Sequence, residues 1–240
     1  MGGKQRQGRI IAEYVRKVLG EEQWYVEPFC GALGVAQRVA HEKMVLADSS
    51  KSLITTWKAV QNPSLELPDT ITEDEYQRLK KTRDPKDWMT AYAGFGVSFG
   101  GKWFGGYARN KVGTNFSRNL KRSVERKRDA ARSATFVCAD YRDLEIPPNS
   151  VVYCDPPYAK RTKAHDFKSF DHDEFWDWCR SKVAEGHVVL ATEFHVPDGF
   201  VVLHSFGDTV VRHHRGRTPD GTVEVLLCHE SQAHLFKGCR

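Results

Sequence analysis

The sequence has no long hydrophobic run. None of its apolar stretches approaches the roughly 18 residues that a membrane-spanning helix needs. The basic amino terminus, MGGKQRQGRI, leads into no apolar signal core, so it indicates no secretory targeting. Gly2 alone does not make a myristoylation signal, because Arg6 stands where that signal has Ser or Thr. We therefore expect a cytoplasmic protein without a membrane partner.

Paired cysteines are also missing. The six cysteines are scattered without a CxxC motif, and four of them lie in apolar runs. This usage is typical of buried thiols in a reducing compartment. Ten histidines are present, but the adjacent His213 and His214 lack ligand spacing and are read more simply as a solvated loop. We expect no bound metal.

Internal repeats and low-complexity linkers are absent as well. A length of 240 residues allows one large domain, or one domain with a small insert. The net charge of +5 is modest but unevenly distributed along the chain. The sequence leaves the oligomeric state open, and we favour a monomer.

The first quarter of the chain has the order of a nucleotide-binding βαβ unit. After an amphipathic helix over residues 8–19, we expect a buried strand at 24–29, and a glycine turn then leads into a helix. A second short strand at 43–48 ends on a carboxylate, and a helix at 52–61 stops before Pro63. This order of strand, glycine turn, helix, strand and acid indicates a βαβ nucleotide-binding unit.

Apolar strands return in the second half of the chain. They are expected at 134–140, 150–155, 187–192, 200–205 and 222–230, with a helix at 172–186. Alternating strands and helices predict an α/β fold with a mostly parallel, seven-stranded sheet. We expect a catalytic domain formed by residues 1–61 and 133–230, an insert at 62–132, and a loose tail at 231–240.

The insert interrupts the α/β rhythm. It begins with a helix that Thr72 can cap, continues through a loop rich in glycine and aromatic residues, and ends in a basic helix within 117–132. Arg118, Arg122 and Arg126 recur at intervals of four, which places them on one helix face. That face is either a solvated surface or a phosphate-contacting one.

Three acids each stand at the end of an expected strand: Asp48, Asp140 and Asp155. In an open α/β sheet these ends share one edge, so the three carboxylates should line one crevice. An acid in the position of Asp48 can accept both hydroxyls of a ribose. The turn formed by Phe29, Gly31 and Gly34 would let the backbone approach a ligand closely, although such glycines also serve tight helix packing.

The stretch YCDPPYAK carries the most specific pattern. Asp155, Pro156, Pro157 and Tyr158 follow an apolar strand directly. The prolines donate no backbone hydrogen bond, and their carbonyl groups stand beside a carboxylate, so the turn presents acceptors only. Such a patch suits an exocyclic amine with two N–H donors, and Tyr158 could stack on the base that bears it. We interpret the motif as a clamp for the amino group of a nucleobase.

These segments resemble, in order, those of the Dam-like D12 class of DNA adenine-N6 methyltransferases. The resemblance includes GGKQR (2–6), YVEPFCGALGV (25–35), LADSSKSLITTWKAV (46–60), FGGKWFGGYARNKVGTNFS (99–117), FVCADYRDL (136–144), VYCDPPY (152–158) and TVEVLLCHE (222–230). It implies a Rossmann-like methyltransferase fold, S-adenosylmethionine as methyl donor, DNA as partner, and target recognition by the insert.

The resemblance also implies roles for individual residues. Donor contacts would come from Lys4, Phe29, Gly31, Gly34, Asp48, Asp140, Tyr141 and Asp155. Residues Asp155 to Tyr158 would be catalytic. Two departures concern the donor: Leu33 replaces a usual glycine, and ATEF (191–194) replaces a Ser-Asn stretch.

The same resemblance gives the insert a nucleic-acid-binding role. Phosphate contacts are expected from Arg118, Lys121, Arg122, Arg126, Lys127 and Arg128, and base contacts from Lys102, Trp103, Arg109 and Asn110.

Other readings stay open at this point. The same amine chemistry would suit N4-cytosine methylation, although that class more often has Ser in place of Asp155. An insert of about 70 residues is small for elaborate duplex readout, which leaves RNA or single-stranded DNA as substrates. A binding module with a decayed methyltransferase fold is the non-enzymatic alternative. The sequence specifies neither a recognition site nor a partner endonuclease.

Overall fold

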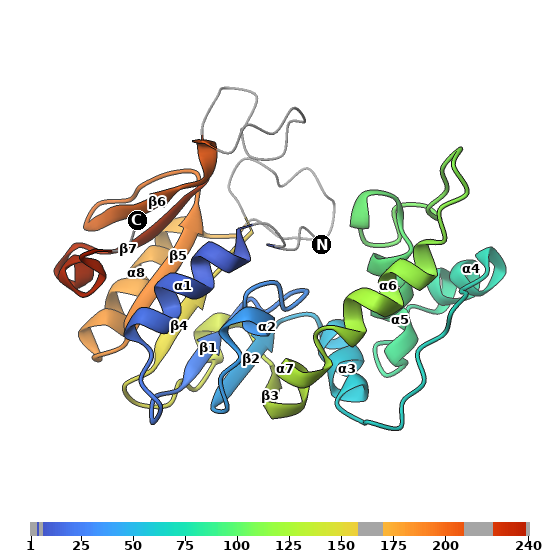
Figure 1. Cartoon of the computed structure of the whole chain (residues 1–240), viewed down its shortest axis with the longest axis horizontal. Helices are drawn as coiled ribbons and strands as arrows, with labels where there is room; N and C mark the ends of the chain where they lie inside the picture. The colour runs from blue at the N-terminus through green and yellow to red at the C-terminus, as the bar shows by residue number, and fades with distance from the viewer. Residues whose placement is uncertain (1–3, 5–6, 158–169, 209–222, 239–240) are drawn as a thin grey trace.

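A seven-stranded sheet forms the centre of the molecule (Figure 1). The computed structural model describes residue 4 and residues 7–157, 170–208 and 223–238. The strand order is β3-β2-β1-β4-β5-β7-β6, with β1 (Tyr25–Glu27), β2 (Met44–Asp48), β3 (Ala134–Cys138), β4 (Val151–Cys154), β5 (Val188–Glu193), β6 (Phe200–Ser205) and β7 (Val225–His229). The first five strands in this order, β3, β2, β1, β4 and β5, pair in parallel. Strand β7 runs antiparallel to both β5 and β6. The mostly parallel sheet predicted from the sequence is confirmed.

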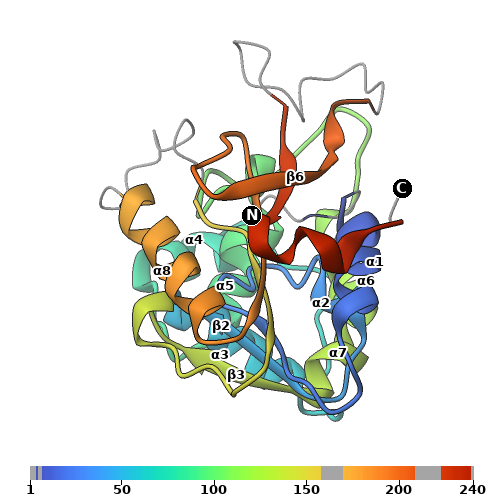
Figure 2. The same cartoon turned by 90° about the vertical axis from the view of Figure 1, so that its left-hand side faces the viewer.

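Helices cover both faces of the sheet (Figure 2). On one face lie α1 (Gly8–Val18), α2 (Ala36–Val39) and α3 (Lys51–Val60), and on the other lies α8 (His172–Ala184). The central strands β1, β2, β4 and β5 are buried on both sides, because helices on each face shield a parallel sheet from water. This is a three-layer α/β arrangement, as expected of a methyltransferase fold.

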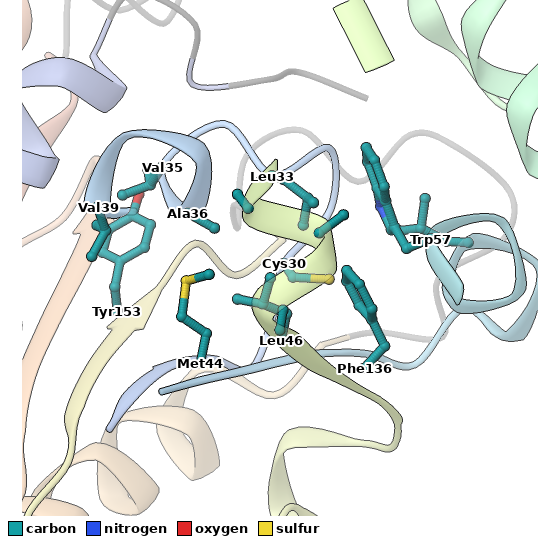
Figure 3. Packing of buried hydrophobic residues seen from close by; sticks show 14 of the residues in the cluster. Cys30, Leu33, Val35, Ala36, Val39, Met44, Leu46, Trp57, Phe136 and Tyr153 are labelled. Atoms are coloured by element: carbon teal, nitrogen blue, oxygen red, sulfur yellow. The ribbon is translucent and has the colours of Figure 1, made fainter. Parts of the chain in front are cut away.

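Strand side chains alternate between two hydrophobic clusters. Met44 and Leu46 of β2 face the cluster on the α1–α3 side, whereas Val45 between them faces α8. In Figure 3, Leu46 lies near Cys30 and Leu33, with Tyr153 to one side and Trp57 and Phe136 to the other. The Trp57 and Phe136 rings are nearly parallel, 6.3 Å apart. The period of two expected for strands therefore builds both cores.

The insert consists of helices beside the β3 edge of the sheet (Figure 1). They are α4 (Glu73–Thr82), α5 (Trp88–Gly96), the 3-10 turn η1 (Phe99–Gly101), α6 (Phe116–Glu125) and α7 (Arg128–Ser133). Thr72 caps α4 as predicted, because its hydroxyl accepts a hydrogen bond from the Glu75 amide at 3.2 Å. The basic helix expected within 117–132 is instead divided into α6 and α7.

Helix α5 occupies part of the segment that the sequence predicted to be a loop. Its two internal glycines lowered the helix propensity of that stretch. They are needed for packing: a Cβ atom on Gly94 would lie 2.8 Å from the Phe104 ring, and one on Gly96 would lie 2.3 Å from the Leu120 side chain. Asp87 begins the helix by accepting a hydrogen bond from the Met89 amide at 2.9 Å. Tertiary contact overrides local propensity here.

The expectation of a loose tail after residue 230 is wrong for the described part of that segment. Glu230–Phe236 forms the 3-10 helix η4, which contacts α1, β6 and β7. Phe236 is buried, and its ring lies 6.2 Å from that of Tyr14. The apolar Phe236 anchors the segment because the α1 face offers it a hydrophobic surface.

Leu33 occupies a strained backbone position. Its φ is +54°, a left-handed conformation that disfavours residues with a Cβ, yet its side chain is completely buried. We expect Leu33→Ala to lower the free energy of unfolding by about 3 kcal/mol, because the cavity is created while the strain remains. Leu33→Gly should be about 1 kcal/mol more stable than Leu33→Ala, since glycine adopts a positive φ without steric cost. Urea denaturation of both variants measures this order, and a more stable alanine variant would contradict strain at this position.

Candidate active site

Acidic side chains follow one edge of the sheet. Five neighbouring strands in the order β3-β2-β1-β4-β5 end, respectively, at or next to Asp140, Asp48, Glu27, Asp155 and Glu193. Parallel strands present their carboxyl ends at the same edge, so these acids form a row. We call this row of five acids the carboxyl edge. Glu27 and Glu193 were missed in the sequence analysis, although each is the last residue of an apolar strand like the acids that were found.

Asp155 lies at the end of a fully buried strand, β4. Its Oδ1 lies 3.0 Å from the Lys4 Nζ and accepts a hydrogen bond from the Thr192 hydroxyl at 3.3 Å. Pro156 is buried and Pro157 is half-buried. Tyr158 lies outside the described residues, so its stacking role stays a prediction. The two contacts to Oδ1 fix the orientation of the carboxylate.

Lys4 joins Asp155 to a second carboxylate. Its ammonium group forms an ion pair and hydrogen bond with Glu224, which also accepts a hydrogen bond from the Gln7 amide at 2.6 Å. Burial acts to lower the pKa of Lys4, but the charges of Asp155 and Glu224 outweigh it, so the pKa lies above its ordinary value of 10.5. Lys4 is therefore a permanent cation between two acids. Glu224 precedes β7 directly and carried no recognisable sequence signal.

Glu27 lies at the middle of the carboxyl edge and is almost completely buried. Its Oε1 accepts a hydrogen bond from the Tyr25 hydroxyl at 2.6 Å. Burial raises the pKa of Glu27 to about 8, and the nearby charge of Asp155 adds to this rise. Glu27 is consequently a mostly neutral acid at pH 7.

Glu193 is the buried acid at the end of β5. Its Oε1 accepts a hydrogen bond from the Phe194 amide at 2.7 Å. Within the described ranges, its Oε2 has no hydrogen-bond partner, and the nearest ring nitrogen is His172 Nδ1 at 3.8 Å. Burial raises the pKa of Glu193 to about 7. The carboxyl edge thus combines acids of different protonation states.

Asp48 holds the glycine turn. Its two oxygens accept hydrogen bonds from the amides of Gly31 at 3.2 Å and Ser50 at 2.9 Å. Burial raises the pKa of Asp48 despite both hydrogen bonds. A Cβ atom on Gly34 would lie 2.9 Å from the Lys4 amide nitrogen, so this glycine is required for close approach of the amino-terminal segment. The turn therefore connects Asp48 with Lys4.

Asp140 has a partner that the sequence analysis did not anticipate. Arg142 donates to both Asp140 oxygens, at 2.7 and 3.0 Å, and also to Glu174 at 3.1 Å. The hydrogen bonds from Arg142 lower the pKa of Asp140. Tyr141 is buried, and its ring lies 5.4 Å from that of Phe29. The expected contacts of Asp140, Tyr141 and Phe29 with a donor remain predictions.

The basic residues of the insert divide into exposed and engaged groups. Lys102, Arg118, Arg122 and Arg126 are exposed. The other exposed candidates have partners: Arg109 pairs with Glu73, and Asn110 donates to the Thr114 hydroxyl at 2.7 Å. Trp103 is half-buried against the Phe95 ring at 4.6 Å, which removes it from the exposed set.

Three expected phosphate contacts are not on a free helix face. Lys121 is half-buried and lies 3.1 Å from Asp69. Arg128 donates to the carbonyl oxygens of Asn62 and Leu65, both at 3.0 Å. Lys127 is 4% exposed, because the break between α6 and α7 turns its side chain inward. The phosphate contacts expected of Lys121, Lys127 and Arg128 remain predictions.

Neither a metal site nor a membrane segment is found in the described part of the chain. No group of three or more His, Cys, Asp or Glu side chains there could hold a metal ion. No helix there is both long and apolar enough to cross a membrane.

Comparison with known proteins agrees with this geometry. A model of the family "D12 class N6 adenine-specific DNA methyltransferase" matches residues 1–92 and 101–202. The chain belongs to this family. The resemblance proposed from the DPPY segment and its collinear neighbours is confirmed.

Curated relatives of this D12 methyltransferase carry the name DNA adenine methylase. The protein of Salmonella typhi is 24% identical over 221 residues, covering 84% of this chain and 78% of its own. That of Escherichia coli (strain K12) is 26% identical over 228 residues, with the same coverage of 84% and 78%. That of Vibrio cholerae serotype O1 (strain ATCC 39315 / El Tor Inaba N16961) is 26% identical over 186 residues, covering 69% and 67%. The chain is thus an enzyme that methylates the N6 amine of adenine in DNA.

The raised pKa of Glu27 predicts a pH-dependent stability. Folded Glu27 keeps its proton up to about pH 8, whereas the unfolded chain releases it near pH 4.5. The folded state therefore binds more protons in this window, and stability falls as the pH rises from about 4.5 to 8. Glu27→Gln should remove the contribution of Glu27 to this decline, while that of Glu193 stays, and increase the free energy of unfolding at pH 8 by up to roughly 4 kcal/mol. Urea denaturation at pH 5 and pH 8 tests this, and an equal decline in both proteins would contradict it.

Proposed function

We propose that this methyltransferase uses S-adenosylmethionine and methylates an adenine that has left the DNA helix and entered the Asp155–Pro156–Pro157 turn. The observation that carries the proposal is the position of this turn. It follows a buried central strand, and Lys4 and Thr192 orient its carboxylate.

The carboxyl edge fits a positively charged donor. Asp155, Glu193 and Glu224 surround Lys4, so acids outnumber cations among the described residues there. A sulfonium cation gains electrostatic energy in such surroundings. Asp48 stands where a ribose would be held and is itself fixed by the Gly31 amide. When bound, S-adenosylmethionine supplies a methyl group on a positively charged sulfur.

The acceptors of the turn would act on the adenine amine. The nitrogen lone pair is delocalised into the ring, which makes the amine a weak nucleophile. Hydrogen bonds from its two N–H groups to the Asp155 carboxylate and the Pro156 carbonyl would favour a pyramidal nitrogen. As the nitrogen–carbon bond forms and the carbon–sulfur bond breaks, positive charge passes to the nitrogen. The same acceptors stabilise that charge, and the nitrogen then loses one proton to solvent.

The target adenine must be accessible to this turn. In a duplex its amine is paired and stacked, so the base has to flip out at a cost of a few kcal/mol. The exposed Arg118 and Arg122 of α6 supply charges that can hold the phosphate backbone during this step.

One experiment tests the proposal as a whole. The protein is incubated with S-adenosylmethionine carrying a labelled methyl group and with separate DNA and RNA pools, and nucleosides are then analysed by mass spectrometry. We expect label in N6-methyladenosine of the DNA pool, in its deoxy form. Label on cytosine, or on RNA alone, would refute the assignment of the substrate. If the folded protein labels neither pool, the proposal that S-adenosylmethionine is its methyl donor is refuted.

Removal of the Asp155 carboxylate should stop the chemistry. We expect Asp155→Ala to reduce methyl transfer about 100-fold or more, because a preorganised charge-stabilising group is lost. Donor affinity, measured by calorimetry, should fall much less than the rate. Asp143→Ala is the matched control, since Asp143 is an exposed acid outside the carboxyl edge. Near-normal turnover by folded Asp155→Ala would exclude the clamp.

Loss of charge on α6 should change the salt dependence of DNA binding. If Arg118 and Arg122 each contact a phosphate, replacement of both by Gln lowers the slope of log affinity against log salt by roughly 2 units. Lys58→Gln on α3 is an exposed control that should leave the slope unchanged. Fluorescence anisotropy with a labelled duplex measures the slope between low and moderate salt. An unaltered slope in the double variant would place α6 outside the interface.

A further inference from the structure

A cavity lies between the glycine turn and the insert. Its volume is about 340 Å³, and its walls come from Ala32 of the turn and from helices α3, α5 and α6. The aromatic residues that line it are Trp57, Tyr92, Phe95 and Phe116. This volume and an apolar lining with few polar groups are typical of small-molecule sites. None of the five acids of the carboxyl edge lines the cavity, so it is distinct from the proposed site of methyl transfer.

Lys127 is the charged residue of this cavity. It is 4% exposed and lines the wall next to Val124. Unlike Lys4, which is held by two carboxylates, Lys127 has no ion pair or hydrogen bond from its ammonium group to any residue in the described ranges. The charged form of such a largely buried side chain is costly, since burial weakens its hydration and no described residue supplies a counter-charge.

The charges around Lys127 increase this cost. Burial, together with the positive charges of Arg126 and Arg38, lowers the pKa of Lys127 to about 8. Of these three cations, Lys127 is the one that lines the cavity. An anion bound there would supply the missing counter-charge and charge-assisted hydrogen bonds.

We propose that this cavity binds one nucleoside monophosphate unit, with its phosphate on Lys127 and its base against the aromatic wall. The phosphate supplies a counter-charge to Lys127, and the planar base can pack on rings such as Trp57 and Phe95. The choice of a nucleotide among aromatic anions rests on the action of this family on DNA. The unit comes either from a free mononucleotide or from a strand of bound DNA.

A ligand in this cavity would contact both the glycine turn and the insert. Ala32 follows Gly31, which Asp48 and Trp57 hold by hydrogen bonds at 3.2 and 2.9 Å. Phe116 and Leu120 belong to α6, the helix with the exposed arginines. Occupation would therefore connect the donor side of the enzyme with its nucleic-acid side.

Binding of deoxyadenosine monophosphate, measured by isothermal titration calorimetry at pH 7, tests the free-nucleotide source. We expect saturable binding to the full-length protein and at least a tenfold loss of affinity in Lys127→Met, which keeps the apolar stem and removes the charge. Lys58→Met is the matched exposed control and should bind like the parent protein. Ser123→Phe is a second variant at the cavity wall and should block binding because the larger side chain fills the cavity. With two variants, a folding defect in one of them still leaves a test of the proposal.

Binding of a short labelled DNA duplex to the same variants tests the strand source. If the mononucleotide does not bind but Lys127→Met and Ser123→Phe both weaken the duplex relative to Lys58→Met, the unit belongs to the DNA. If neither ligand distinguishes these variants from the control, the proposal is refuted. None of these measurements requires methyl transfer, so a failure of the proposed donor chemistry would be seen separately in the labelling experiment.

Discussion

The ion cluster of Lys4, Asp155 and Glu224 determines how the rest of the site is built. Five acids converge because the register of parallel strands sends every carboxyl end to one edge. The ionised acids of this row would repel each other unless a cation were placed among them. Lys4 supplies it, and close packing of Gly34 on the Lys4 backbone fixes its place. The glycine turn, the amino-terminal segment and the catalytic strand are therefore parts of a single electrostatic unit.

Protonation differs along this edge for physical reasons. Glu27 and Glu193 are buried with few donors, so desolvation keeps their pKa values near neutrality. Asp140 has the Arg142 guanidinium beside it and ionises easily. An edge with both neutral and charged acids can surround a cation and an uncharged base together. A row of five ionised acids would have a higher free-energy cost of burial.

Much of this arrangement could be predicted from the sequence, because short buried strands end on recognisable residues. All seven strands, the Thr72 cap and the collinear DPPY segment follow from local pattern. The role of Glu224 could not be predicted from local pattern, because Glu224 comes before an antiparallel strand rather than after a parallel one. Only the order of strands in the sheet brings it to Lys4. The burial of Lys127 could not be predicted, because a helical period does not reveal a break between α6 and α7. Helix α5 was missed because its glycines serve contacts with residues distant in sequence.

The antiparallel direction of β7 has a consequence for biosynthesis. It brings the amino end of the last strand to the carboxyl edge, so that Lys4 meets a partner 220 residues away. On the ribosome, the charge cluster would stay incomplete until the segment with Glu224 had emerged. The cluster therefore depends on two segments that are synthesised far apart in time, one with Lys4 and one with Glu224.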